Sequence, residues 1–193
     1  MKELCIIPDS SFYICFTHDL QNKDWIYEFL DIYSAYAGNR IIEEISEKLS
    51  NEDIIFSRIK VIDFDYYELV RPYFGRSEKH IDDGEYEAIG IAHYLEIKGC
   101  LKYLILDDKK GRAFVKNHFP YLVDRMVGTI GFIRYSCCRD KTINIAHAIE
   151  ILTKIKTTVD MGKINRPCST DKESYKAVLI HTIEKINNEC KDG

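Results

Sequence analysis

Apolar side chains in this chain of 193 residues fall either in short continuous runs or in runs spaced three or four residues apart. Short runs predict buried strands and spaced runs predict amphipathic helices. The expected strands cover 4–8, 59–62, 102–106 and 122–127. The expected helices cover 25–37, 40–49, 66–70, 84–98, 112–117, a segment that starts at 128–131, 142–157 and 170–187. Because strands alternate with helices, we expect an α/β fold in which helices cover both faces of a central parallel sheet.

The chain is expected to form one main domain with a C-terminal addition. Residues 1–165 form the expected α/β domain and 166–193 a helical extension, because the stretch from Gly162 to Thr170 has the composition of a linker. No apolar run approaches the roughly 18 residues that cross a bilayer, and no secretory signal pattern is present. We therefore expect a cytoplasmic protein with no membrane partner. Its seven cysteines show no Cys-x-x-Cys spacing, so we expect reduced, structural thiols.

Four groups of acidic residues stand where the predicted elements begin or end. They are Asp9 after the first strand, Glu43 and Glu44 in the helix 40–49, Asp83, Glu85 and Glu87 at the start of the helix 84–98, and Asp107 and Asp108 after the strand 102–106. Carboxylates that lie close together raise one another's pKa values unless a cation joins them. Since residues that follow parallel strands meet at one edge of the sheet, the order of these groups predicts a divalent-cation site there.

Each acidic group also has an ordinary structural explanation. Asp9-Ser10-Ser11 is a helix-capping pattern, and Glu43 and Glu44 suit an exposed helix surface. Acids in the first turn of a helix are favoured by its dipole by about 0.3–1 kcal/mol each. The joint order of all four groups, more than any one of them, indicates a site.

Charge is distributed unevenly along the chain. Residues 1–108 hold 11 Lys and Arg against 22 Asp and Glu, whereas residues 109–166 hold 12 against 4. Carboxylates that hold cations, followed by basic groups that hold a polyanion, suit a metal-dependent phosphodiesterase. Lys109, Lys110 and Arg112 are the candidate phosphate contacts, and the hydroxyl of Ser10 or Thr129 is the candidate for orienting a water molecule. An ordinary solvent-exposed basic surface explains this uneven distribution of charge equally well.

The acidic motifs resemble those of PIN-domain nucleases, in particular a VapC-like bacterial and archaeal subgroup. The resemblance rests on Asp82-Asp83-Gly84-Glu85-Tyr86-Glu87-Ala88-Ile89, on Asp107-Asp108-Lys109-Lys110-Gly111-Arg112-Ala113 and on Gly128-Thr129-Ile130-Gly131, and it spans residues 4 to about 162. It implies a three-layer α/β/α fold, Mg²⁺ or Mn²⁺ in an acidic pocket, and hydrolysis of RNA. The chain departs from commoner members by a Glu at the third acidic position and by its C-terminal extension.

The resemblance also implies roles for individual acids. Asp9, Glu44, Glu87 and Asp108 match the four catalytic acids, with Glu43 and Asp107 as the alternatives at the second and fourth positions. The expected metal ligands are Asp9, Glu44, Glu85, Glu87, Asp107 and Asp108.

Partners follow from the same resemblance. Many such proteins are toxins that a cognate antitoxin neutralises, so an RNA substrate and an antitoxin are expected, together with a homodimer. The main alternative is a non-catalytic module of the same fold that binds RNA or protein. A receiver-like phosphoryl-transfer domain fits less well, because Asp9 stands alone in a loop where such domains usually carry two acids.

Overall fold

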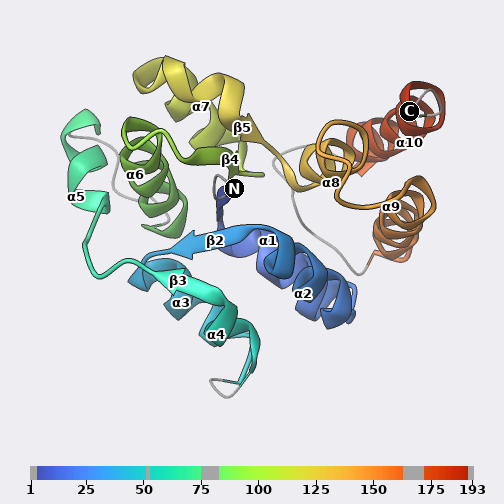
Figure 1. Cartoon of the computed structure of the whole chain (residues 1–193), viewed down its shortest axis with the longest axis horizontal. Helices are drawn as coiled ribbons and strands as arrows, with labels where there is room; N and C mark the ends of the chain where they lie inside the picture. Colours follow the sequence, from blue (N-terminus) through green and yellow to red (C-terminus); the bar gives the residue numbers. More distant parts are fainter. Residues whose placement is uncertain (1–3, 51–52, 75–82, 163–171, 191–193) are drawn as a thin grey trace.

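The computed structural model describes residues 4–50, 53–74, 83–162 and 172–190 (Figure 1). Five parallel strands form one sheet in the order β3-β2-β1-β4-β5. The strands are β1 (Cys5–Pro8), β2 (Ser34–Ala37), β3 (Ile59–Val61), β4 (Leu101–Ile105) and β5 (Met126–Val127). In the central pair, Pro8 of β1 lies opposite Ile105 of β4, so both strands end at the same edge. The predicted parallel sheet is confirmed.

Helices cover both faces of this sheet. On one face α6 (Asp83–Ile97) packs against β1, β2 and β4, and it also contacts α3 (Asn39–Ser46), α5 (Tyr67–Val70) and α7 (Lys109–His118). On the other face lie α1 (Ser10–Ile14), α2 (Lys23–Ile32) and α8 (Thr129–Cys138). α9 (Ile145–Asp160) packs on α8, and α10 (Lys172–Glu189) packs on both α8 and α9. The architecture is therefore α/β/α, as the sequence predicts.

Shorter helices connect these elements. They are the π-helix η1 (Cys15–Asp19), α4 (Ile55–Arg58) and the 3₁₀ helices η2 (Arg71–Tyr73) and η3 (Pro120–Arg125). The core between the sheet and α8 is aromatic. The ring of Phe132 lies 5.5 Å from that of Phe12 and 5.1 Å from that of Phe29, measured between centroids.

Two expected elements are wrong over part of their length. The helix expected over 25–37 ends at Ile32, and Ser34–Ala37 forms β2 instead. Ala35 and Ala37 are buried while Ser34 and Tyr36 are half-buried, which is the two-residue alternation of a strand. The strand expected over 122–127 is mostly η3, because Pro120 starts a helical turn, and only Met126–Val127 joins the sheet.

The C-terminal extension is attached covalently. A disulfide joins Cys138, at the end of α8, to Cys190, just beyond α10. The expectation of unpaired thiols is therefore wrong for these two cysteines, because their 52-residue separation carries no spacing signal and they meet only when α10 packs on α8. Cys5, Cys15, Cys100 and Cys137 do not take part in a disulfide. Cys168 and the predicted start of the last helix at Thr170 lie outside the described residues.

The described helices include none whose length and apolar character would let it cross a lipid bilayer. This agrees with the expected absence of a membrane-spanning helix.

Candidate metal and nucleic-acid site

Asp9 lies at the end of β1, where its backbone N–H donates a 2.9 Å hydrogen bond to the carbonyl of Ile105. Its carboxylate is 1% exposed. One carboxylate oxygen accepts from the backbone N–H of Phe12 at 3.1 Å and so caps α1, and the other accepts from the backbone N–H of Asp107 at 3.2 Å. The acids after β1 and β4 are therefore brought together, as expected from the sheet.

Asp107 is held by Thr129 at the start of α8. The backbone N–H of Thr129 donates to Asp107 Oδ1 at 2.9 Å, and the Thr129 hydroxyl donates to Oδ2. Burial raises the pKa of Asp107, while the hydrogen bonds from Thr129 and the positive charge of Arg112 lower it. Thr129, expected to orient water, thus holds a carboxylate in place. Ser10, the other residue expected to orient water, lies half-buried in the first turn of α1.

The charge of Asp9 is disfavoured by its surroundings. Burial raises the pKa of Asp9, and the charges of Asp107 and, more weakly, Glu44 raise it further, against the two backbone hydrogen bonds that lower it. An acid pair of this kind, with Asp9 buried and Asp107 half-buried, is favourable in its charged form only when a cation is present.

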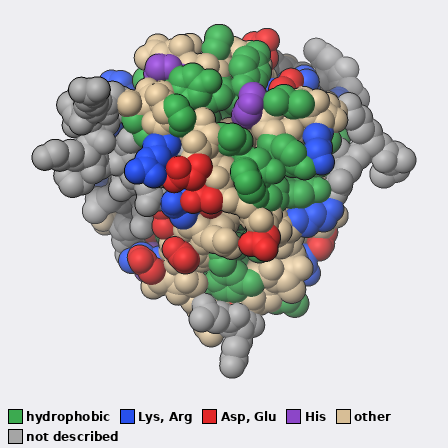
Figure 2. All heavy atoms as spheres, turned by 90° about the vertical axis from the view of Figure 1, so that its left-hand side faces the viewer, with side chains coloured by type: hydrophobic (Ala, Val, Ile, Leu, Met, Phe, Trp, Pro, Cys, Tyr) green, Lys and Arg blue, Asp and Glu red, His purple; other side chains and the backbone are tan. Residues whose placement is uncertain are grey.

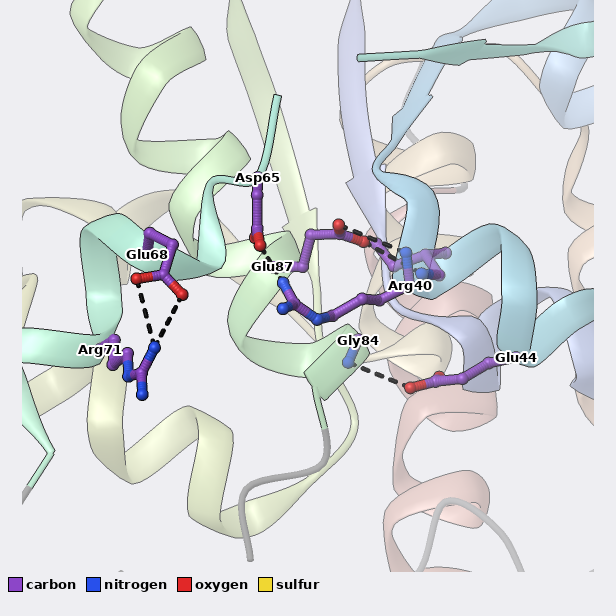
Figure 3. A network of polar contacts seen from close by, with 8 residues as sticks. Arg40, Glu44, Asp65, Glu68, Arg71, Gly84 and Glu87 are labelled. Carbon is purple, nitrogen blue, oxygen red and sulfur yellow. Dashed lines mark hydrogen bonds and ion pairs between the residues drawn. The ribbon is translucent and has the colours of Figure 1, made fainter. Parts of the chain in front are cut away.

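Glu44 approaches the site from α3, whereas Glu43 is exposed. One oxygen of Glu44 accepts from the backbone N–H of Gly84 at 3.0 Å, in the first turn of α6 (Figure 3). Of the two alternatives at the second acidic position, Glu44 is the one that faces another element of the site.

Glu87 points elsewhere. Its carboxylate is 1% exposed and accepts from the backbone N–H groups of Arg40 at 3.3 Å and Ile41 at 3.0 Å, at the beginning of α3 (Figure 3). Arg40 in turn forms an ion pair with Asp65. Burial raises the pKa of Glu87, and these hydrogen bonds and the charge of Arg40 lower it. The structure thus places Glu87 as a cap at the beginning of α3.

Two further carboxylates lie at the start of α7, that of Asp108 and that of Glu85, which belongs to α6. Asp108 accepts from the backbone N–H of Gly111 at 2.8 Å and so caps this helix. The carboxylate of Glu85 lies beside the same turn, since a side chain on Gly111 would place its Cβ 3.4 Å from Glu85 Oε2. The side chain of Asp83 lies outside the described part of the structure.

These acids do not close into a tight cluster. Among the described residues, the only three acidic, histidine or cysteine side chains whose ligand atoms lie within 4.8 Å of one another are Cys137, Cys138 and Cys190. The acidic site thus consists of the Asp9–Asp107 pair, with Glu44 within electrostatic range. Mg²⁺ in proteins usually keeps several water ligands and binds only one or two carboxylates. This set of oxygen donors therefore fits Mg²⁺ or Mn²⁺.

Tyr13 adds a group that sequence reasoning missed. Its hydroxyl is buried and has no hydrogen-bond partner among the residues that the structure describes, and burial and then the charge of Asp9 raise its pKa. A buried hydroxyl without a partner is uncommon and calls for a water or ion nearby. Its position one turn after Asp9 is the signal that could have revealed it.

A basic cavity of about 620 Å³ lies beside the acid pair and is bounded by α7, α8 and α10. Asp107 lines it, together with Lys109 and Arg112, whereas Lys110 does not. Two of the three expected phosphate contacts therefore face the space next to the acids.

A different side of the molecule carries exposed apolar groups. Figure 2 views the side of α5 and α6 and shows hydrophobic side chains gathered between acidic and basic ones. Leu69 of α5, Phe64 just before it and Tyr73 of η2 are 43%, 53% and 50% exposed. Apolar groups that gather on a surface favour contact with another protein.

No protein-family model matches the chain, and neither curated proteins nor solved structures give a match.

Proposed function

We propose that this protein is a metal-dependent endoribonuclease of the PIN type, with its centre at the carboxyl edge of the sheet. The observation that carries the proposal is the pair of buried Asp9 and half-buried Asp107, of which Asp107 lines a cavity together with Lys109 and Arg112. Acids for a divalent cation and cations for a phosphate chain thus lie next to each other. This juxtaposition is what hydrolysis of a phosphodiester requires.

The chain's own residues divide the work. Asp9, Asp107 and Glu44 would hold Mg²⁺ or Mn²⁺. The carboxylate of Glu85, at the start of α7, is a further candidate ligand. When bound, the metal would offset negative charge on the scissile phosphate and make an attacking water more acidic. Thr129 fixes the orientation of Asp107, and Arg112 balances its charge and contacts the phosphate. Lys109 would contact the neighbouring phosphate of the RNA strand. Glu87 and Asp108 have an indirect role in this proposal, because they cap helices α3 and α7.

The partners of this activity are also part of the proposal. The motif resemblance supports a toxin whose substrate is RNA and whose inhibitor is an antitoxin protein, and it supports a homodimer. Phe64, Leu69 and Tyr73 supply an apolar surface for one of these contacts. The proposed location is the cytoplasm. A reducing cytoplasm would keep the Cys138–Cys190 pair open, so the redox state of this pair in cells tests the location.

The direct test is cleavage by the purified protein. End-labelled RNA of mixed sequence is incubated with Mn²⁺, Mg²⁺ or EDTA, and products are separated by size. We expect cleavage with either metal, none in EDTA, and loss of cleavage in Asp9→Asn, whose side chain keeps an acceptor oxygen for Phe12. Failure to cut any RNA with Mn²⁺, or an Asp9→Asn variant as active as wild type, contradicts the proposal.

A non-catalytic binding module is the second candidate, and one observation favours it. Asp9, Glu44, Glu87, Asp107 and Asp108 each accept a backbone N–H at the start of a helix. These contacts explain why the acids are stable where they are without a cation. Titration calorimetry separates the two candidates, because a nuclease site takes up Mn²⁺ at millimolar concentration and a pure binding module gives no heat.

A further inference from the structure

The cavity next to Asp107 has walls from two helices that are far apart in sequence. Figure 1 shows α8 between α7 and α10, and α8 supplies the floor. From α7 come Lys109, Arg112, Ala113 and Lys116, whose spacing of three, one and three residues defines one helical face. From α10 come Tyr175, Val178, Thr182 and Lys185, spaced by three, four and three residues, with His181 beside them. Two helical faces thus point into the same space.

The charge of this space contrasts with that of the whole chain. The formal net charge of the protein is −4, yet five cationic side chains line the cavity against a single carboxylate, that of Asp107. The five are Lys109, Arg112, Lys116, Arg134 and Lys185. Like charges that gather around one cavity repel one another unless an anion enters it. The site is therefore built for an anionic ligand.

The apolar lining narrows the class of anion. Val178 is 51% exposed although it lines a cavity rich in charge, and Ile130 lines the floor. A simple inorganic anion gains nothing from apolar contacts, whereas a nucleotide can pack its base and sugar on apolar side chains while its phosphate contacts the cations. The volume of about 620 Å³ lies within the range of pockets that enclose small organic ligands, and it suits unpaired nucleotides better than a duplex.

We propose that α10, together with α7, forms a binding site for single-stranded nucleic acid beside the acid pair, and that Lys185, Val178 and His181 contact the bound strand. The inference rests on the proposed function for the nature of the polymer. It gives the C-terminal extension a direct role with the substrate. An acidic peptide would satisfy the cations but not the apolar wall, so it is the weaker ligand.

The test measures binding with cleavage switched off. The full chain is titrated into a fluorescein-labelled RNA of about ten nucleotides in EDTA, and Kd follows from anisotropy at several salt concentrations. Lys185→Glu of α10 and Lys116→Glu of α7 are each expected to weaken binding about tenfold and to reduce the salt slope by about 0.7 for each lost phosphate contact. Lys48→Glu, at an exposed lysine outside the cavity, serves as the matched control and leaves Kd unchanged.

A second pair of variants tests the space itself. Gly131 lines the floor, and a Cβ added to it would meet only Val127, at an ordinary 3.7 Å. Gly131→Met, which fills the cavity, is therefore expected to weaken RNA binding more than Gly131→Ala does. Thermal unfolding checks that both variants remain folded.

The outcomes separate this inference from the proposed function. RNA binding in EDTA that the cavity variants weaken supports the inference even if no metal brings about cleavage, and in that case only the nuclease proposal fails. Cleavage and binding that Lys185→Glu, Lys116→Glu and Gly131→Met leave unchanged overturn the inference and keep the nuclease. Absence of RNA binding by wild type also overturns it, as does a polyglutamate peptide of equal length that binds more tightly than RNA.

Discussion

The backbone N–H of Asp107 donates a hydrogen bond to the carboxylate of Asp9 at 3.2 Å, and so ties together the ends of the two central strands. The contact joins residues that are 98 positions apart. The hydrogen bond holds the carboxylate of Asp9 on the backbone of Asp107. The relative position of the two acids therefore depends on the register of β1 and β4 more than on the side-chain rotamer of Asp107. Asp108, the next residue, faces α7 instead.

This relationship predicts different outcomes for two neighbouring acids. Asp107→Asn keeps an acceptor for Thr129 but removes a charge beside Asp9, so we expect cleavage with Mn²⁺ to fall by about 100-fold or more. Asp108→Asn still caps α7, and residue 108 faces this helix and not Asp9. We therefore expect activity within about threefold of wild type. Single-turnover rates measure both. An inactive, folded Asp108→Asn beside an active Asp107→Asn would reverse the assignment.

The raised pKa of Asp9 predicts an unusual dependence of stability on pH. A carboxyl group whose pKa is higher in the folded than in the unfolded state stabilises the fold while it is protonated, and this contribution is lost as pH rises through the folded pKa. In EDTA we expect the unfolding temperature to fall from about pH 4, near the ordinary pKa of an aspartate, to about pH 8, the raised pKa of Asp9. Mn²⁺ should restore more stability at the alkaline end, because its ligands must be deprotonated.

Asp9→Asn is the control for this dependence. Its side chain does not titrate, so the difference in unfolding free energy between wild type and variant isolates the contribution of Asp9. A difference that stays constant over the pH range would show that Asp9 has an ordinary pKa.

Glu87 is predicted to serve the fold and not the reaction. Glu87→Ala leaves the N–H groups of Arg40 and Ile41 without their acceptor, and we expect it to lower the free energy of unfolding by about 1–3 kcal/mol. Glu87→Gln keeps an acceptor oxygen and should lose less. Urea unfolding measures both, and cleavage per folded molecule should remain close to that of wild type. Glu44→Gln is the contrasting variant, since its loss of charge near Asp9 should lower activity. A stable Glu87→Gln protein that cannot cleave RNA would return Glu87 to the catalytic set.

The Cys138–Cys190 disulfide is predicted to stabilise α10 and its binding surface together. Reduction, or Cys138→Ser, releases the end of α10 and should lower the free energy of unfolding by about 2–4 kcal/mol. RNA affinity in EDTA should fall as well, because one wall of the basic cavity is then less firmly held. Cys100→Ser, which removes a free thiol, is the control. Equal stability and equal affinity with and without reductant would show that the bond has no such role.

The fold was predictable from the sequence where one pattern dominated. Continuous apolar runs predicted β1 and β4, and their burial on both sides of a parallel sheet explains why no alternation was needed. β2 was missed, because Tyr33, Ala35 and Ala37 continue the apolar content of the preceding helix and only their alternating burial distinguishes a strand. The choice of strand was made by tertiary pairing with β1.

The site was predictable in location but not in the direction of each side chain. Residues after β1 and β4 meet because parallel strands end together, which follows from topology alone. Whether Asp107 or Asp108 faces Asp9 depends on one peptide orientation, and whether Glu87 faces the acids or α3 depends on how α3 and α6 pack. The α10 wall of the cavity lay beyond prediction for a similar reason, since it arises from the docking of a helix that the family resemblance does not cover.

The capping role of the acids has a consequence for how such a protein can change over generations. Asn and Gln carry an oxygen where Asp and Glu carry one, so a single-base change in a codon can erase an anionic group while the peptide N–H beneath it keeps an acceptor. Chemistry and architecture are thereby separable in this molecule. A descendant that had lost the proposed hydrolysis in one step would keep the same helix caps, and with them the cavity proposed to bind the polymer.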